Sequence, residues 1–214
     1  MAMSVVAIQH LMVEACEPLL QPTRSRCELF RQSCQSVGLR DFPDKAVMSG
    51  FMTADARFGG LPRPLATWND EISFWTSYYG EVLASLGQSP PLALLQRLVQ
   101  SLVTRQSVAV HPALPGIVGR VGKSGGRVIL VADWYVSFRQ TLINSGLLGL
   151  FPEIFLAGQQ GIFLEDQSGL LVMLRTLGLR AETVTFLGVP RAALSELGIT
   201  CCSGDHLESL PFTG

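Results

Sequence analysis

The sequence predicts a three-layer α/β sandwich with a mainly parallel central sheet. Short apolar runs and amphipathic helical segments alternate from residue 127 towards the end of the 214-residue chain. This alternation is typical of βαβ units, whose crossover helices cover both faces of a parallel sheet. The clearest strand covers residues 127–132, Arg-Val-Ile-Leu-Val-Ala, a continuous apolar run suited to the middle of the sheet.

The N-terminal part is expected to begin with one strand and to continue as a helix and irregular chain. Residues 4–12 form a short apolar run rich in β-branched side chains, which is typical of a buried strand. Residues 24–37 place apolar side chains along one helical stripe, and Gly38 follows as a helix stop. Proline and glycine interrupt residues 41–67 repeatedly, so this segment is expected to be irregular.

The later elements follow from apolar spacing and from the residues at their ends. Apolar residues three and four apart predict helices over 69–86, 91–104, 115–123, 136–145, 167–177 and 190–197. Short apolar runs predict further strands over 154–157, 184–188 and 199–202. Asn69 is placed to cap the first of these helices, and Gly146 and Gly178 follow two of the others.

Composition excludes several classes of function. Only 15% of the residues are charged, against roughly 25% in typical soluble domains, and 48% are hydrophobic. We therefore expect a large buried core and a surface that is partly covered by a partner. The net charge is −1 and the isoelectric point is about 6.3, so there is no electrostatic basis for binding nucleic acid or an anionic membrane.

A cytoplasmic location is expected. No apolar stretch reaches the ~18–20 residues of a membrane span. No basic region precedes the N-terminal apolar segment, as it would in a signal peptide. The five cysteines are odd in number and form no Cys-x-x-Cys motif, which argues against a disulfide framework or a zinc site. Reduced thiols are typical of an intracellular protein.

Residues 112–157 carry the best part of a resemblance to a known family. Pro-Ala-Leu-Pro-Gly at 112–116, followed by Gly-Arg-Val-Ile-Leu-Val-Ala-Asp at 126–133, resembles a stretch of the haloacid dehalogenase (HAD) superfamily that ends in its second motif. Residues 69–106 look like the later helices of the family's cap. The resemblance implies a Rossmann-like core, residues 1–15 and 108–214, with a helical cap, residues 16–107, inserted after the first strand.

The resemblance also implies catalytic motifs whose residues are missing here. The first motif places an aspartate nucleophile at the end of the first strand and a second acid two residues later, and this sequence has Gln9 and Leu11 at the expected places. A glutamine amide is a far weaker nucleophile than a carboxylate, and leucine transfers no proton. The second motif ends its strand on serine or threonine, where this chain has Ala132 followed by Asp133.

The third and fourth motifs are also changed. The third requires a basic residue within 159–165, which reads Gln-Gln-Gly-Ile-Phe-Leu-Glu. The fourth requires acids after Gly188 to hold Mg²⁺, and the residues that follow are Val-Pro-Arg-Ala-Ala. Arg191 would repel the cation. The resemblance therefore implies no catalytic residue at Gln9, Leu11, Ala132 or Gly188, and no resident cofactor.

Some side chains remain candidates for chemistry or binding. Asp133 follows a central strand, where open α/β sheets bind ligands, although capping of the next helix is the role that we favour. Tryptophan and tyrosine occur only within 68–79 and at 134–135, places that the resemblance puts on either side of a cleft between cap and core. Such a cleft suits an apolar ligand or closed packing. The candidate cleft residues are His10, Trp68, Trp75, Tyr79, Asp133, Trp134 and Arg191.

One hypothesis and two alternatives follow. The main hypothesis is a catalytically inactive HAD-like protein that acts by protein–protein binding, as a scaffold, subunit or regulator, with another protein or a second copy as partner. The first alternative is an active HAD-type hydrolase or phosphatase with relocated residues, with Asp133 as the acid and Mg²⁺ as cofactor. The second alternative is a small-molecule binder that uses the aromatic cleft. Nucleic acid and a membrane span are not expected.

Overall fold

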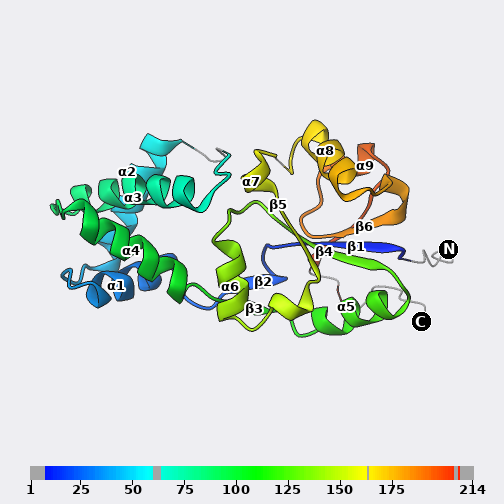
Figure 1. Ribbon diagram of the computed structural model, residues 1–214, viewed down its shortest axis with the longest axis horizontal. Helices are drawn as coiled ribbons and strands as arrows, with labels where there is room; N and C mark the ends of the chain where they lie inside the picture. The colour runs from blue at the N-terminus through cyan, green and yellow to red at the C-terminus, as the bar shows by residue number, and fades with distance from the viewer. Residues whose placement is uncertain (1–7, 60–63, 163, 205–206, 208–214) are drawn as a thin grey trace.

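A five-stranded parallel sheet forms the centre of one half of the molecule (Figure 1). The computed structural model describes residues 8–59, 64–162, 164–204 and 207. The strand order is β5-β4-β1-β6-β7, and all neighbouring pairs are parallel. The strands are β1 (His10–Glu14), β4 (Arg127–Ala132), β5 (Glu153–Leu156), β6 (Val184–Leu187) and β7 (Thr200–Cys202). The predicted α/β fold with a mainly parallel sheet is confirmed.

Helices cover both faces of this sheet, which gives the three layers. The helices of this half are α5 (Leu114–Lys123), α6 (Phe138–Asn144), α7 (Ala157–Gln160), α8 (Gln167–Leu177) and α9 (Ala192–Glu196), with 3-10 turns at Leu148–Leu150 and Ala181–Thr183. Side chains of α5 and α6 pack in one buried cluster, and those of α8 and α9 pack in another. The sheet lies between the two clusters.

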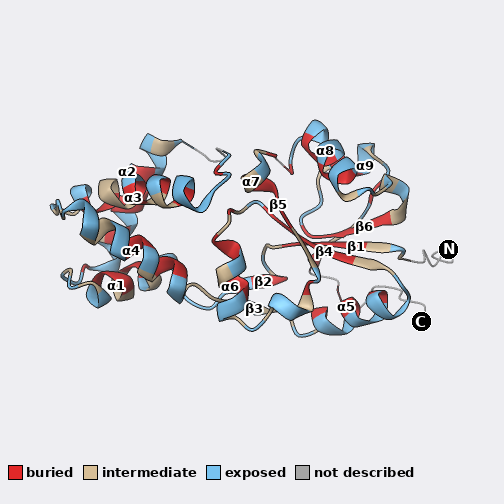
Figure 2. Cartoon of the chain, in the orientation of Figure 1, coloured by how far each residue is buried: buried red, intermediate tan, exposed pale blue. Residues whose placement is uncertain are grey.

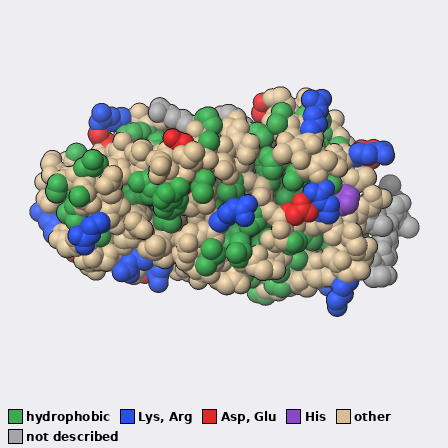
Figure 3. Space-filling view, viewed as in Figure 1, with side chains coloured by type: hydrophobic (Ala, Val, Ile, Leu, Met, Phe, Trp, Pro, Cys, Tyr) green, Lys and Arg blue, Asp and Glu red, His purple; other side chains and the backbone are tan. Residues whose placement is uncertain are grey.

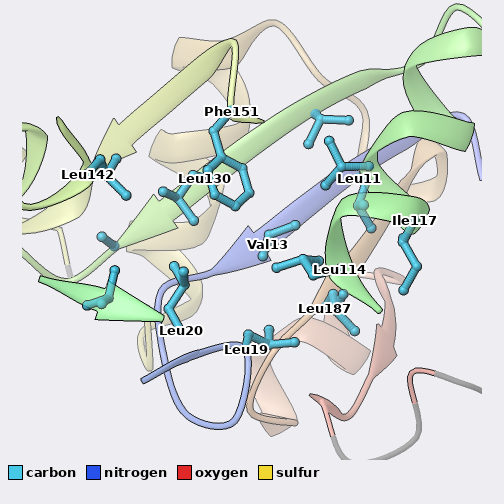
Figure 4. Close-up of a cluster of buried hydrophobic side chains, with 14 of the residues drawn as sticks. Leu11, Val13, Leu19, Leu20, Leu114, Ile117, Leu130, Leu142, Phe151 and Leu187 are labelled. Atoms are coloured by element: carbon cyan, nitrogen blue, oxygen red, sulfur yellow. The ribbon is translucent and has the colours of Figure 1, made fainter. Parts of the chain in front are cut away.

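The alternation of side chains along β4 joins these layers. Val128 and Leu130 point into the cluster under α5 and α6, whereas Ile129 and Val131 point into the cluster under α8 and α9. Figure 4 shows Leu130 in the first of these clusters. Each such side chain contributes roughly 1.5–3 kcal/mol on full burial. A strand buried on both faces accounts for the uninterrupted apolar sequence of 127–132.

Within the described residues, four helices with a core of their own form the other half of the molecule. They are α1 (Arg26–Ser36), α2 (Asp44–Phe58), α3 (Trp68–Ser85) and α4 (Leu92–Arg105), and their buried faces meet inside this half (Figure 2). Two short antiparallel strands, β2 (Leu20–Pro22) and β3 (Val108–Val110), pair where the chain leaves the sheet half and returns to it. In the described part of the chain, no helix has both the length and the apolar character of a membrane span.

The prediction of irregular chain over 41–67 was wrong, because α2 occupies most of that segment. Three of the prolines and glycines there, Pro43, Gly50 and Gly59, lie at the ends of the helix or at one contact and do not break it. Pro43 is the N-cap and Gly59 the C-cap. Gly50 faces α3 so closely that an added Cβ would lie 3.1 Å from a Val82 methyl and 3.2 Å from the Val82 carbonyl oxygen. Glycine here allows two helices to approach each other.

The first strand begins later than predicted. We expected it at 4–12, but β1 is His10–Glu14, and residues 1–7 lie outside the described part of the chain. Glu14 is paired with Val131 of β4, and the next amide, that of Ala15, donates to the Val131 carbonyl at 2.8 Å. The apolar pattern could not distinguish these limits, because residues 5–8 are as apolar as residues 11–13.

A buried carboxylate fastens the helical half to the sheet half. Glu71 of α3 is fully buried. It accepts hydrogen bonds from the Ser137 amide at 2.8 Å, from the Ser137 hydroxyl, and from the Trp75 indole N–H at 3.2 Å. No ion pair of the described residues involves this carboxylate, so these bonds compensate the loss of its hydration.

Removal of this carboxylate is expected to weaken the whole fold. Glu71→Ala leaves the Ser137 and Trp75 donors without their acceptor, and we expect a loss of about 3 kcal/mol in the free energy of unfolding. Urea denaturation followed by circular dichroism measures this loss. Glu196→Ala, which removes an exposed glutamate of α9, is the matched control. Equal stability of the two variants would contradict the role of Glu71.

Candidate functional site at the carboxyl edge of the sheet

Three central strands end side by side on polar or small residues. β1 ends at Glu14, β4 ends at Ala132 and is followed by Asp133, and β6 is followed by Gly188. In open parallel sheets this carboxyl edge is where ligands bind. The structure therefore places Ala132, Asp133 and Gly188 where the sequence predicted them.

Gln9 and Leu11 are not at this edge, and their assignment to the first motif was wrong. Gln9 precedes β1 at its amino end, and Leu11 is fully buried inside the strand. Because β1 extends to residue 14, Glu14 takes the position at the end of the strand. His10 is likewise outside the predicted cleft. It is the first residue of β1, and its Nδ1 accepts from the Arg127 amide at 3.3 Å.

A buried ion pair occupies the edge. The Arg191 guanidinium bonds both carboxylate oxygens of Glu14, with Nη2–Oε1 at 2.5 Å and Nη1–Oε2 at 3.0 Å. The Val189 amide also donates to Oε2, at 2.7 Å. The Glu14 side chain is only 7% exposed and the Arg191 side chain only 13%. This bidentate geometry is the strong form of an arginine–carboxylate bond.

Glycine at position 188 makes room for this pair. A Cβ at Gly188 would lie 2.4 Å from Glu14 Oε2, so no larger residue fits without moving the carboxylate. Burial lowers the pKa of Arg191, but its bonds to the Glu14 carboxylate and the nearby negative charges raise that pKa by more. The pKa of Arg191 is therefore above its usual value. A second acid, the exposed Glu165, lies 3.4 Å from Arg191 Nε. Arg191 is therefore charged at any physiological pH.

A neutral thiol stands beside the ion pair. Cys16 follows Glu14 by two residues, and it is where the resemblance implies a second acid. Desolvation and the negative charge of Glu14 raise the pKa of the Cys16 thiol to about 12. At pH 7 this thiol is protonated, and it acts neither as a thiolate nucleophile nor as an effective proton donor.

The pKa of the Asp133 carboxyl group at this edge is raised towards neutral. Although the residue as a whole is exposed, partial desolvation of its carboxyl and the charges of Glu165 and Glu14 raise its pKa to about 6, while Arg191 opposes the shift. The predicted helix-capping role was wrong, because α6 begins at Phe138 and its N-cap is Ser137. Asp133 can therefore exchange a proton near neutral pH.

The described residues at this edge do not form a magnesium site. Over the described ranges, no group of three or more His, Cys, Asp or Glu side chains is arranged to hold a metal ion. Magnesium requires several oxygen ligands in an octahedral arrangement. Here a guanidinium bonds both oxygens of Glu14 and supplies the positive charge itself.

The predicted aromatic cleft is a separate cavity. Three of the candidate cleft residues, Trp75, Tyr79 and Trp134, line it. Trp68 does not, because it begins α3 with an exposed side chain. Asp133 and Arg191 belong to the carboxyl edge and do not line this cavity.

Glu14, Cys16 and the arginines that line the cavity were not predicted from the sequence; these arginines are Arg24, Arg26 and Arg105. Glu14 had one usable signal, since it is an acid that directly follows the apolar run of residues 11–13. No signal in the sequence pointed to the arginines, because they lie on two segments about 80 residues apart that meet only in the folded chain.

Comparisons with known proteins agree with this architecture. No family model and no curated protein matches the chain. Among solved structures, the L-2-haloacid dehalogenase of Xanthobacter autotrophicus with covalently bound chloropropionic acid is 12% identical, with a TM-score of 0.59, over 91% of this chain and 76% of that one. This protein has the HAD fold.

Two further solved structures support the same conclusion. A Bacillus subtilis protein described as a HAD hydrolase, YfnB, bound to magnesium, is 12% identical with a TM-score of 0.61, over 92% of this chain and 89% of that one. A HAD-family enzyme of Bacteroides thetaiotaomicron in complex with magnesium and inorganic phosphate is 11% identical with a TM-score of 0.58, over 92% and 94%. At this level of identity, the similarity establishes the fold alone.

The raised pKa of Asp133 predicts a pH dependence of stability. As pH rises from about 4 to about 6, Asp133 ionises in the unfolded chain before it does in the folded protein. The wild type should therefore lose stability relative to Asp133→Asn over this range, with no further relative change above it. Urea midpoints of both proteins at several pH values measure the difference. Parallel curves would contradict the shift.

Proposed function

We propose that this protein combines the HAD fold with a function in binding, and that it does not carry out magnesium-dependent phosphoryl transfer. The observation that supports this most directly is the buried Glu14–Arg191 ion pair at the carboxyl edge. The guanidinium, rather than a metal ion, neutralises the carboxylate at the end of β1.

The chemistry of phosphoryl transfer supports this proposal. Catalysis of that reaction depends on positioned charges and metal ions that neutralise the phosphoryl oxygens. A carboxylate nucleophile must also reach its target, whereas Glu14 is buried and accepts bonds on both oxygens. The neighbouring Cys16 thiol is protonated and offers no substitute.

Two kinds of binding partner are compatible with this proposal. The low content of charged residues favours another protein or a second copy of the chain, as predicted from composition. The cavity lined by Trp75, Tyr79 and Trp134 favours a small molecule.

A second candidate function is hydrolysis without a metal. The solved structures that resemble this chain include hydrolases, one of them with covalently bound chloropropionic acid, so the comparisons taken alone favour an active hydrolase over a scaffold. Asp133, with a pKa of about 6, is the residue that would transfer the proton. The ion pair at Glu14 is the reason that we place this candidate second.

A direct assay separates these two functions. We expect no turnover of p-nitrophenyl phosphate with or without Mg²⁺, and no chloride release from 2-chloropropionate. The reason is that Arg191 holds Glu14 and that, among the described residues, no group of His, Cys, Asp and Glu side chains is arranged to hold a metal ion. Turnover that requires Mg²⁺ and disappears in Glu14→Gln would contradict the proposal. Turnover without Mg²⁺ that disappears in Asp133→Asn would establish the second candidate.

The control for this assay is Gln9→Ala. Gln9 is exposed at the amino end of β1, so any turnover should be unchanged in this variant. Loss of turnover in Gln9→Ala together with Asp133→Asn would point to unfolding rather than chemistry, and circular dichroism of each variant tests that.

A further inference from the structure

The cavity between the two halves is large enough for a small ligand. Its volume is about 310 Å³, at the lower end of the range for ligand pockets. It is lined by both connecting segments, by α1, α3 and α4 of the helical half, and by the loop that follows β4. On the face drawn in Figure 3, hydrophobic side chains with Lys and Arg side chains among them lie over the middle of the molecule.

The walls of the cavity are mainly aromatic and aliphatic. Trp75 and Tyr79 come from α3 and Trp134 from the loop after β4. The aliphatic part of the wall is made by Leu29, Val99, Leu102 and Val103. Flat aromatic walls select a planar ring, because stacking and edge-to-face contacts add to the gain from burial.

Arginines supply the charge. The lining includes Arg24, Arg26 and Arg105 and no acid. Arg26 is already paired with Asp55 by two bonds, at 3.1 and 3.2 Å. Arg24 and Arg105 take part in no ion pair of the described residues.

The guanidinium of Arg24 lies against the backbone of Arg105. Arg24 Nη1 donates to the Arg105 carbonyl oxygen at 2.9 Å, and Arg105 Nε donates to the Ser101 hydroxyl at 3.1 Å. Each guanidinium has five N–H donors, so several remain beyond these bonds. Two like charges beside an apolar wall are best satisfied by an anion that both can bond.

The nearest buried acid does not supply that anion. Glu71 does not line the cavity, and its oxygens accept the bonds from Trp75 and Ser137 already described. A ligand carboxylate would therefore lie at the arginine end, away from Glu71.

We propose that this cavity binds a small planar aromatic anion, with the ring among Trp75, Tyr79 and Trp134 and the negative group on Arg24 and Arg105. Such a ligand would contact both halves of the molecule and both connecting segments. The segments already meet through the Thr23 amide and the Ser107 carbonyl, at 3.0 Å. The inference rests on the proposed binding function and names its ligand class.

Calorimetry with matched probes tests the proposal. The probes are naphthalene-2-carboxylate, its neutral amide naphthalene-2-carboxamide, and octanoate, an anion without a ring. We expect one naphthalene-2-carboxylate to bind per chain, and to bind about tenfold or more tightly than the amide, because the amide lacks the charge-assisted bonds. Octanoate should also bind more weakly than naphthalene-2-carboxylate. Added salt should weaken the binding of naphthalene-2-carboxylate, because it screens the attraction between the charges.

Variants locate the site. Arg24→Gln and Arg105→Gln should each lower the affinity for naphthalene-2-carboxylate about tenfold. The affinity for the amide should be unchanged in both variants. Arg97→Gln, an exposed arginine on the same helix as Arg105 and outside the cavity, should have no effect. Quenching of tryptophan fluorescence on binding would place the ring in the aromatic wall.

Several results would overturn the proposal. They are no binding of naphthalene-2-carboxylate, equal affinity for the amide, equal affinity for octanoate, or unchanged binding in both arginine variants. None of these results bears on the ion pair at Glu14, which the hydrolysis assay tests separately. Failure of the cavity proposal is thus distinguishable from failure of the proposed function.

Discussion

The ion pair between Glu14 and Arg191 is the interaction on which the carboxyl edge of the sheet depends. Removing two charges from water is costly unless they bond each other well, and here the bidentate contact and the Val189 amide provide those bonds. The pair also explains two neighbours, since Gly188 must lack a side chain and Cys16 must hold its proton. The Arg191 guanidinium supplies a fixed positive charge at this edge, and the parallel sheet accommodates it.

The two halves of the molecule are joined by polar contacts around an apolar cavity. Glu71 bonds Ser137 across the junction, and the connecting segments bond each other through Thr23 and Ser107. These contacts hold the aromatic side chains of α3 opposite Trp134. A ligand in the cavity would add to contacts that already exist, so binding requires little ordering of the chain. Arg191 does not line this cavity, so the proposed binding site and the ion pair at the edge of the sheet are made of different residues.

Local sequence signals predicted much of the fold, whereas features that depend on contacts between distant parts of the chain were missed. Strand 127–132 and helix 167–177 were predicted with their observed bounds, because a continuous apolar run and a capped amphipathic stripe are local features. The end of β1 depends on its pairing with Val131, which the sequence does not show. Helix α2 was missed because Gly50 acts through its contact with α3. Trp75, Tyr79 and Trp134 were among the candidate cleft residues, but the arginines of the cavity are brought together by the pairing of segments far apart in the chain.

A double-mutant cycle on the ion pair tests the central claim most directly. Arg191→Leu, Glu14→Leu and the double variant are compared with the wild type by urea denaturation. Arg191→Leu is expected to cost about 3–5 kcal/mol, because it leaves the Glu14 carboxylate buried without a partner, and the double variant should cost much less than the sum of the two single changes. Additive losses would show that the two side chains do not stabilise each other, and that this edge of the sheet is not organised by their pairing.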